Sequence, residues 1–221
     1  MTKYLDEDLP GLPNLPRSRR SSVGLCPRTG NRQLPSGTVI SNLTSYITLS
    51  ESYVDPVVVT TLQVTQGSTL IRLVSTIINV SPEGFTVQLI PFRYQEDVVA
   101  IDVPVTVHYF AVESGVTYVV NNSFHRTVAG TYTASAGSSN AVNVSYELPF
   151  DVWTENVIVI PQLTGTTPLA VRLTDVGRDG FSSFVTREEQ DANVMATAGI
   201  MYVAFPQSAI DGFWIVERAF Y

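Results

Sequence analysis

The chain has 221 residues, of which 44% are hydrophobic and only 15% are charged, and its formal net charge is −7. This acidic balance argues against binding of nucleic acid by the chain as a whole. No apolar run is long enough to cross a membrane, and the polar N-terminal residues do not resemble a signal peptide. The single cysteine, Cys26, excludes an intrachain disulfide framework and fits a free thiol in a reducing compartment.

Residues 1–36 differ in composition from the rest of the chain. They hold six of the 13 basic residues and three of the 20 acidic residues, which leaves seven basic and 17 acidic residues for the remainder. Leu-Pro-x triplets favour an extended polyproline-like backbone here and exclude a helix. A disordered tail is one interpretation, and an arm that orders against a neighbouring subunit is the one we favour. The residues expected to contact that neighbour are three leucines and three arginines: Leu9, Leu12, Leu15, Arg17, Arg19 and Arg20.

From residue 37 onward the sequence is typical of β-structure. Many segments are rich in Val, Ile and Thr, and residues 85–91 alternate between apolar and polar side chains, as in a half-buried antiparallel strand. Ser81-Pro82-Glu83-Gly84 is a turn signal, and residues 129–139, rich in Gly, Ala, Ser and Thr, suit a linker or a long hairpin tip. No segment has a convincing helical period. Strands are expected at 41–49, 56–62, 70–80, 85–91, 103–111, 156–162, 169–176, 181–186 and 199–205.

One pattern occurs twice along the chain. Val-Ser-Pro-Glu-Gly-Phe at 80–85 returns as Val-Gly-Arg-Asp-Gly-Phe at 176–181, and each copy lies between an apolar strand and an aromatic-x-Ala strand. The spacing between matching segments drifts by a few residues, as loop insertions and deletions in a duplicated domain would produce. The chain is therefore expected to be all-β, with two tandem antiparallel β-sandwich domains at 37–120 and 121–221 behind the arm.

Groups suited to catalysis are sparse. His108 and His125 have no partner at metal-ligand spacing, and no nucleophile or phosphate-binding motif occurs. Glu188, Glu189 and Asp191 form the only dense acidic cluster, which fits a solvated hairpin tip better than calcium or a pair of catalytic carboxylates. We therefore expect no enzymatic activity, no metal and no cofactor.

The aromatic residues leave two interpretations open. Trp153 and Trp214 could stack on sugar rings, although packing in a core or at a protein interface is the favoured interpretation. Residues 213–221 are strongly β-forming and end in bare aromatics, so they should complete a sheet of this chain or of a neighbour.

The repeated segments resemble the H-type lectin fold, and in particular the lectin-like repeats of bacteriophage virion proteins. The resemblance spans residues 56–115, with Asn79-Val80 and Gly84-Phe85 as its best points, and residues 156–204, with Gly180-Phe181 and Arg187-Glu188-Glu189. It implies six-stranded antiparallel β-sandwiches that assemble as trimers, with sugar sites near subunit interfaces. The second copy lacks the proline step that precedes the first, and no sugar-binding residue of the family can be placed on this sequence.

These observations lead to one functional expectation and one alternative. The expectation is a non-enzymatic bacteriophage virion protein, namely a head decoration, a head fibre or a tail-associated subunit, assembled in the host cytoplasm as a homotrimer. It would dock on other capsid or tail proteins through its N-terminal arm. The alternative is a carbohydrate-binding lectin or receptor-binding tail protein whose partner is a host-surface glycan. No nucleic acid and no membrane is expected as a partner.

Overall fold

The computed structural model describes residues 28–34, 39–40, 43–64, 73–91, 99–100, 105–120, 124–135, 141–154, 156–167, 169–186 and 197–207. Throughout these ranges the elements are strands, so the all-β fold expected from the sequence is confirmed for this part of the chain. The strands are β1 (Arg28–Leu34), β2 (Val39–Ile40), β3 (Leu43–Thr48), β4 (Pro56–Val64), β5 (Leu73–Ser81), β6 (Gly84–Pro91), β7 (Val99–Ala100), β8 (Val105–Glu113), β9 (Gly115–Val120), β10 (Phe124–Ser135), β11 (Val142–Ser145), β12 (Val157–Thr164), β13 (Ala170–Thr174), β14 (Gly180–Thr186) and β15 (Thr197–Pro206).

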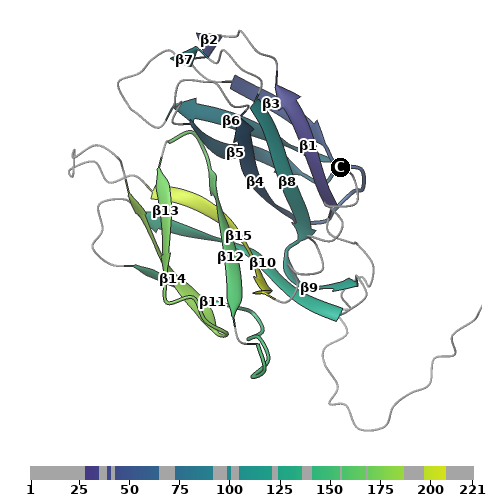
Figure 1. Cartoon of the computed structure of the whole chain (residues 1–221), viewed down its shortest axis with the longest axis vertical. Helices are drawn as coiled ribbons and strands as arrows, with labels where there is room; N and C mark the ends of the chain where they lie inside the picture. The colour runs from purple at the N-terminus through teal and green to yellow at the C-terminus, as the bar shows by residue number, and fades with distance from the viewer. Residues whose placement is uncertain are drawn as a thin grey trace, which may run out of the picture.

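The largest sheet has seven strands in the order β3-β6-β5-β12-β15-β10-β9. Two sheets of three strands accompany it, with the orders β1-β8-β4 and β11-β14-β13, and β2 pairs with β7. Figure 1 shows β1, β8 and β4 with the first strands of the large sheet, and β11, β13 and β14 with its later strands.

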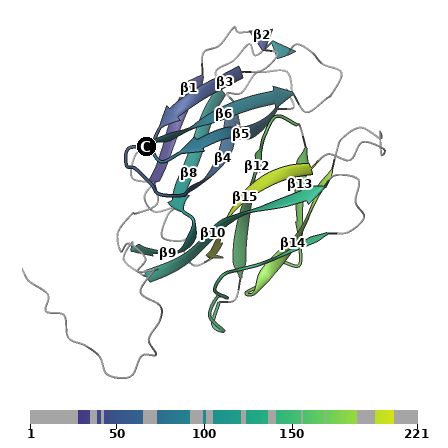
Figure 2. The ribbon, with the colours of Figure 1, turned by 180° about the vertical axis from the view of Figure 1, so that it is seen from behind.

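The hydrophobic clusters show that the described strands pack in four layers. Val58 and Val107 of the β1-β8-β4 sheet pack on Phe85 and other residues of β3, β5 and β6. The opposite face of the same sheet packs through Val57 on Val203 and other residues of β10 and β15. The far face of these strands packs in turn on the β11-β14-β13 sheet. The seven-stranded sheet therefore supplies two of the four layers and encloses the β1-β8-β4 sheet between them (Figure 2).

The strand orders of the two halves correspond to each other. The order β1-β8-β4 matches β10-β15-β12, and β3-β6-β5 matches β11-β14-β13. Three backbone hydrogen bonds in the connecting loops also recur at matching places, all at 2.8–2.9 Å. In the first half they run from Leu49 N–H to Glu83 O, from Tyr53 N–H to Pro82 O and from Ser114 N–H to Asp55 O. Their counterparts in the second half run from Tyr146 N–H to Asp179 O, from Phe150 N–H to Arg178 O and from Gln207 N–H to Asn156 O. The correspondence therefore extends from the sequence pattern to the loop geometry.

The repeated Gly-Phe pair has a steric explanation. A Cβ atom on Gly84 would lie 2.6 Å from the carbonyl oxygen of Ile47, and one on Gly180 would overlap with the carbonyl oxygen of Val144. Ile47 and Val144 face Phe85 and Phe181 in the strand register, so the two close approaches occur at matching positions. Both phenylalanines are buried, at 0% and 3% exposure. The pattern thus combines a position without space for a side chain and a core aromatic residue.

The two halves of the large sheet meet at β5 and β12, which pair in parallel only at Ile77 and Thr164. The buried side chain of Gln162 completes this junction. Its Oε1 accepts hydrogen bonds from the N–H of Thr60 at 2.8 Å and from the Thr60 hydroxyl at 2.7 Å, and its Nε2 donates to the carbonyl oxygen of Ser75 at 2.8 Å. One amide therefore links β4, β5 and β12 where few ladder bonds exist.

Two expectations from the sequence need correction. Residues 129–135 are not a linker, because they belong to β10, which pairs with β9 and β15 inside the large sheet. Alternating small and polar residues obscured this strand, and its identity is decided by neighbours on both sides. Residues 28–34 belong to the arm predicted at 1–36, yet they form β1 and pair with β8. The rest of the proposed arm, residues 1–27, lies outside the described residues, and the domain boundaries at 37–120 and 121–221 stay a prediction.

Candidate functional site

The most distinctive exposed feature is the loop between β11 and β12. Trp153 in this loop is 89% exposed and Val152 is 72% exposed, whereas an unsupported apolar side chain of this size is normally covered. The corresponding loop of the first half has one residue, Val54, between Tyr53 and Asp55. The second half has five residues between Phe150 and Asn156, so Trp153 lies on a four-residue insertion.

The base of this loop is firmly anchored. Tyr146 and Phe150 are each 5% exposed, and their rings meet edge-to-face with centroids 5.3 Å apart. The guanidinium of Arg126 lies 5.0 Å from the centre of the Phe150 ring and donates to the carbonyl oxygen of Pro149. These contacts hold the loop in place, so Trp153 is presented on a preorganised support.

The loop is also acidic. Residues 146–156 contain Glu147, Asp151 and Glu155 and no lysine or arginine. The carboxylate of Asp151 lies 3.9 Å from the guanidinium of Arg126, with its own side chain 81% exposed. The exposed surface of this loop therefore combines an indole, an aliphatic side chain and negative charge.

Beneath the loop lies an aromatic cluster of Tyr132, Tyr146, Phe181 and Tyr202, with ring centroids 5.2–6.3 Å apart. Burial raises the pKa of Tyr132 to about 12, partly offset by its hydrogen bond to the Ser183 hydroxyl at 2.7 Å. Burial also raises the pKa of Tyr146, with a further contribution from Tyr202, and that of Tyr202, with a further contribution from Glu147. These phenols stay neutral at ordinary pH and support the loop as packing groups.

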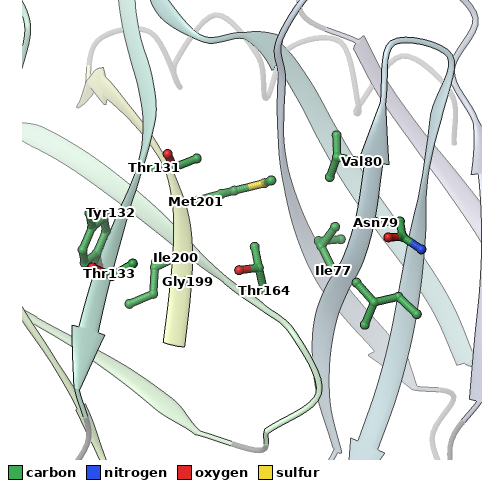
Figure 3. Close-up of a pocket in the computed structure, with 11 residues that line it drawn as sticks. Ile77, Asn79, Val80, Thr131, Tyr132, Thr133, Thr164, Gly199, Ile200 and Met201 are labelled. Atoms are coloured by element: carbon green, nitrogen blue, oxygen red, sulfur yellow. The ribbon is translucent and has the colours of Figure 1, made fainter. Parts of the chain in front are cut away.

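A second feature is a groove of about 500 Å³ beside the junction of the two halves (Figure 3). Ile77, Ile78, Asn79 and Val80 of β5 form one wall, and residues of β10 and β15 form the other. Figure 3 shows Met201 reaching from β15 toward β5. The groove exists because β12 ends at Thr164, while β5 continues past it with a bulge between Ile77 and Asn79.

The groove offers hydrogen-bonding groups without charge. The hydroxyl groups of Thr131, Thr133 and Thr164 and the amide of Asn79 are its polar groups, and the described lining contains no carboxylate, imidazole, ammonium or thiol. A second hollow, of about 380 Å³, on the Ser75 and Gln162 side of the junction is likewise lined by uncharged residues. Such surfaces suit a neutral polar ligand.

Of the other residues singled out in the sequence, some lie in the described part of the chain and others lie outside it. His108 lies in β8, where its Nε2 is 2.7 Å from Oε1 of Gln63, an ordinary sheet-surface pairing. In the parts of the chain that the structure covers, no group of His, Cys, Asp and Glu could hold a metal ion, and no helix is long and apolar enough to span a membrane. The following predicted residues lie outside the described residues: Leu9, Leu12, Leu15, Arg17, Arg19, Arg20, Cys26, Glu188, Glu189, Asp191 and Trp214.

For Trp153, its 89% exposure rules out packing in the core of this chain, while packing at a protein interface or on a sugar ring stays a prediction. Its exposure follows from the insertion, which carries the indole beyond the buried Phe150. A sequence signal for this existed: the spacing from Leu49 to Asp55 is six residues and that from Tyr146 to Asn156 is ten. Only the loop hydrogen bonds show that Leu49 corresponds to Tyr146 and Asp55 to Asn156, so the sequence alone does not locate the insertion.

The chain was compared with protein families, curated proteins and solved structures. No protein-family model matches the chain, and no curated protein or solved structure matches it.

Proposed function

We propose that this chain is a non-enzymatic structural protein of a bacteriophage virion, a head decoration, head-fibre or tail-associated subunit. It would dock through its N-terminal arm, assemble as a homotrimer and display two H-type lectin-like β-sandwiches. The observation that carries this proposal is the matched strand order of the two halves, joined by a buried core at Val57 and Val203. A doubled β body with a basic N-terminal segment suits assembly into a larger structure.

The packing between the two halves also supports a structural role. Val57, Val112 and Val203 are at most 1% exposed between two layers, and Gln162 joins three strands at the junction. Forces applied at one half would therefore be transmitted to the other through a packed interface.

The test is co-sedimentation with virions assembled without this protein. In the full chain, Leu9, Leu12 and Leu15 are replaced together by Ser, and Pro27→Ala serves as a matched change outside the Leu-Pro-x triplets. We expect the wild-type chain and Pro27→Ala to bind the particles and the triple variant to lose binding. Equal binding by the triple variant would rule out docking through the arm.

The second candidate is a lectin or receptor-binding protein, and the exposure of Trp153 is the specific observation that favours it. An exposed indole on a rigid loop can stack on a sugar face, and the uncharged groove could hold hydroxyl groups. A glycan array with the wild-type chain and Trp153→Ala distinguishes the two candidates. Binding that disappears in the variant supports the lectin, and silence of the wild-type chain counts against it.

A further inference from the structure

We propose that the Trp153 loop is the binding site for the N-terminal arm of a second copy of this chain. The inference rests on the proposed function, since it assigns the contact through which copies of the chain assemble into the homotrimer. The loop surface is defined here by Leu148, Val152 and Trp153, which are 44%, 72% and 89% exposed.

The first argument is that the loop presents an aromatic anchor at low entropic cost. Its backbone is fixed by the hydrogen bonds of Tyr146 N–H to Asp179 O and Phe150 N–H to Arg178 O, and the tip by Thr154 N–H to Asp151 O, all at 2.9 Å. A preorganised, exposed Trp is the residue type that most often dominates a binding interface. The first half has only Val54 at this place, so the feature belongs to the second half alone.

The second argument is the spacing of the prolines. Pro10, Pro13 and Pro16 are three residues apart, and so are Leu9, Leu12 and Leu15. A polyproline II helix has three residues per turn, so in that conformation each set lies along one edge. Polyproline II segments with this spacing dock on exposed aromatic side chains, and they lose little entropy when they bind.

The third argument is charge. Residues 9–20 contain three arginines and no acidic residue, and residues 146–156 contain three carboxylates and no basic residue. Arg126 is 11% exposed and is already engaged with Phe150, Pro149 and Asp151. An arriving segment with Arg17, Arg19 and Arg20 therefore meets complementary charge.

The test compares full-length variants by sedimentation equilibrium over a range of concentrations. Trp153→Ala removes the anchor, and a triple change of Pro10, Pro13 and Pro16 to Ala removes the polyproline edge. Val54→Ala is the matched control, since Val54 is 87% exposed in the corresponding loop of the first half. We expect wild type and Val54→Ala to self-associate alike, and the other two variants to associate at least about tenfold more weakly.

Mixing the two weakened variants separates binding between copies from binding within one copy. The Trp153→Ala chain has an intact arm, and the triple proline variant has an intact loop, so an equimolar mixture should form a heterodimer that neither variant forms alone. Association of Trp153→Ala at wild-type strength would overturn the proposal, and so would a mixture that stays monomeric. In a Trp214→Phe background, a blue-shifted Trp153 emission that does not change on dilution would place the arm on its own body and would also overturn it.

This result can be separated from the proposed function. Trp153→Ala and the triple leucine variant are tested in parallel in the particle co-sedimentation experiment. Particle binding retained by the leucine variant refutes docking through the arm, whatever the self-association shows. Particle binding that depends on the leucines, together with self-association that is indifferent to Trp153, refutes only the assignment of the loop.

Discussion

Individual side chains in the aromatic cluster beneath the Trp153 loop differ in how their polar atoms are satisfied. The hydroxyl of Tyr132 donates to Ser183 at 2.7 Å. The hydroxyl of Tyr146 is buried and has no hydrogen-bond partner among the residues that the structure describes. A buried phenol that lacks a partner contributes its ring to packing and pays the desolvation cost of its hydroxyl. The two tyrosines therefore form a natural pair for comparison.

We predict that Tyr146→Phe leaves the free energy of unfolding unchanged within about 0.5 kcal/mol or increases it, because it removes an unsatisfied hydroxyl. Tyr132→Phe should lower it by about 1–2 kcal/mol, because the buried hydroxyl of Ser183 then loses its partner. Urea denaturation of both variants measures this difference. The reverse order of stabilities would show that Tyr146 has a polar partner and would contradict the packing role.

The same cluster predicts how stability depends on alkaline pH. The pKa of Tyr132 is raised from its ordinary value of 10.0 to about 12, and those of Tyr146 and Tyr202 are raised as well, so the folded state favours the neutral phenols. This contribution is fully present below pH 10 and is lost as the pH rises through the folded pKa values. We expect the urea midpoint to fall between pH 10 and pH 12, and to fall less in Tyr132→Phe. An identical slope in that variant would exclude Tyr132 as a contributor.

At the scale of elements, the two Gly-Phe turns and the β5–β12 junction determine how strands meet. Each turn brings a glycine against a carbonyl group of the paired neighbouring strand, β3 or β11, and the buried Phe that follows fixes the strand in the core. The junction uses a side chain, Gln162, where the backbone ladder between the parallel strands is limited to one pair. At the turns and at the junction alike, the position of a strand therefore depends on one particular side chain or on the absence of one.

For the turns, Gly84→Ala and Gly180→Ala should each destabilise the fold by on the order of 1–3 kcal/mol, because the added methyl group overlaps with the Ile47 or Val144 carbonyl oxygen. Gly177→Ala is the matched control, since its added Cβ would have its nearest neighbours at 4.0 Å. Thermal unfolding followed by circular dichroism measures all three. A control as unstable as the other two would mean that backbone freedom, and not the close approach, requires glycine.

For the junction, Gln162→Leu should cost on the order of 2–4 kcal/mol, because the N–H of Thr60 and the carbonyl oxygen of Ser75 lose their partners in a buried site. Gln63→Leu is the comparison on an exposed face, where only the contact with His108 is lost, and should change stability by about 0.5 kcal/mol or less. Guanidinium denaturation of both variants tests this. Equal effects would show that the junction is held by other contacts.

At the scale of the whole molecule, the described strands of the two halves share one sheet and one core. Val57, Val59 and Val112 of the first half pack on Ala129 and Val203 of the second. A duplication could have produced two independent bodies, yet here the layers alternate so that neither half can lose its strands without exposing apolar surface of the other.

We therefore predict a single calorimetric unfolding transition for the full chain, with equal calorimetric and van't Hoff enthalpies. Val203→Ala, which opens a cavity in the shared layer, should lower the stability by about 2 kcal/mol and keep the transition single. Val176→Ala, at a position 40% exposed, should have little effect. Two resolved transitions in the wild-type chain would contradict the shared core.

The all-β class, most of the strands and the duplicated Gly-Phe pattern could be predicted from the sequence, because alternation, β-branched residues and turn residues act locally along the chain. The sequence did not reveal β10, whose residues 129–135 look like a linker, since two neighbouring strands decide their conformation. The parallel pairing of β5 with β12, the role of Gln162 and the exposure of Trp153 likewise became apparent only in the folded chain. Each depends on contacts between residues distant in sequence, which local physical preferences cannot specify.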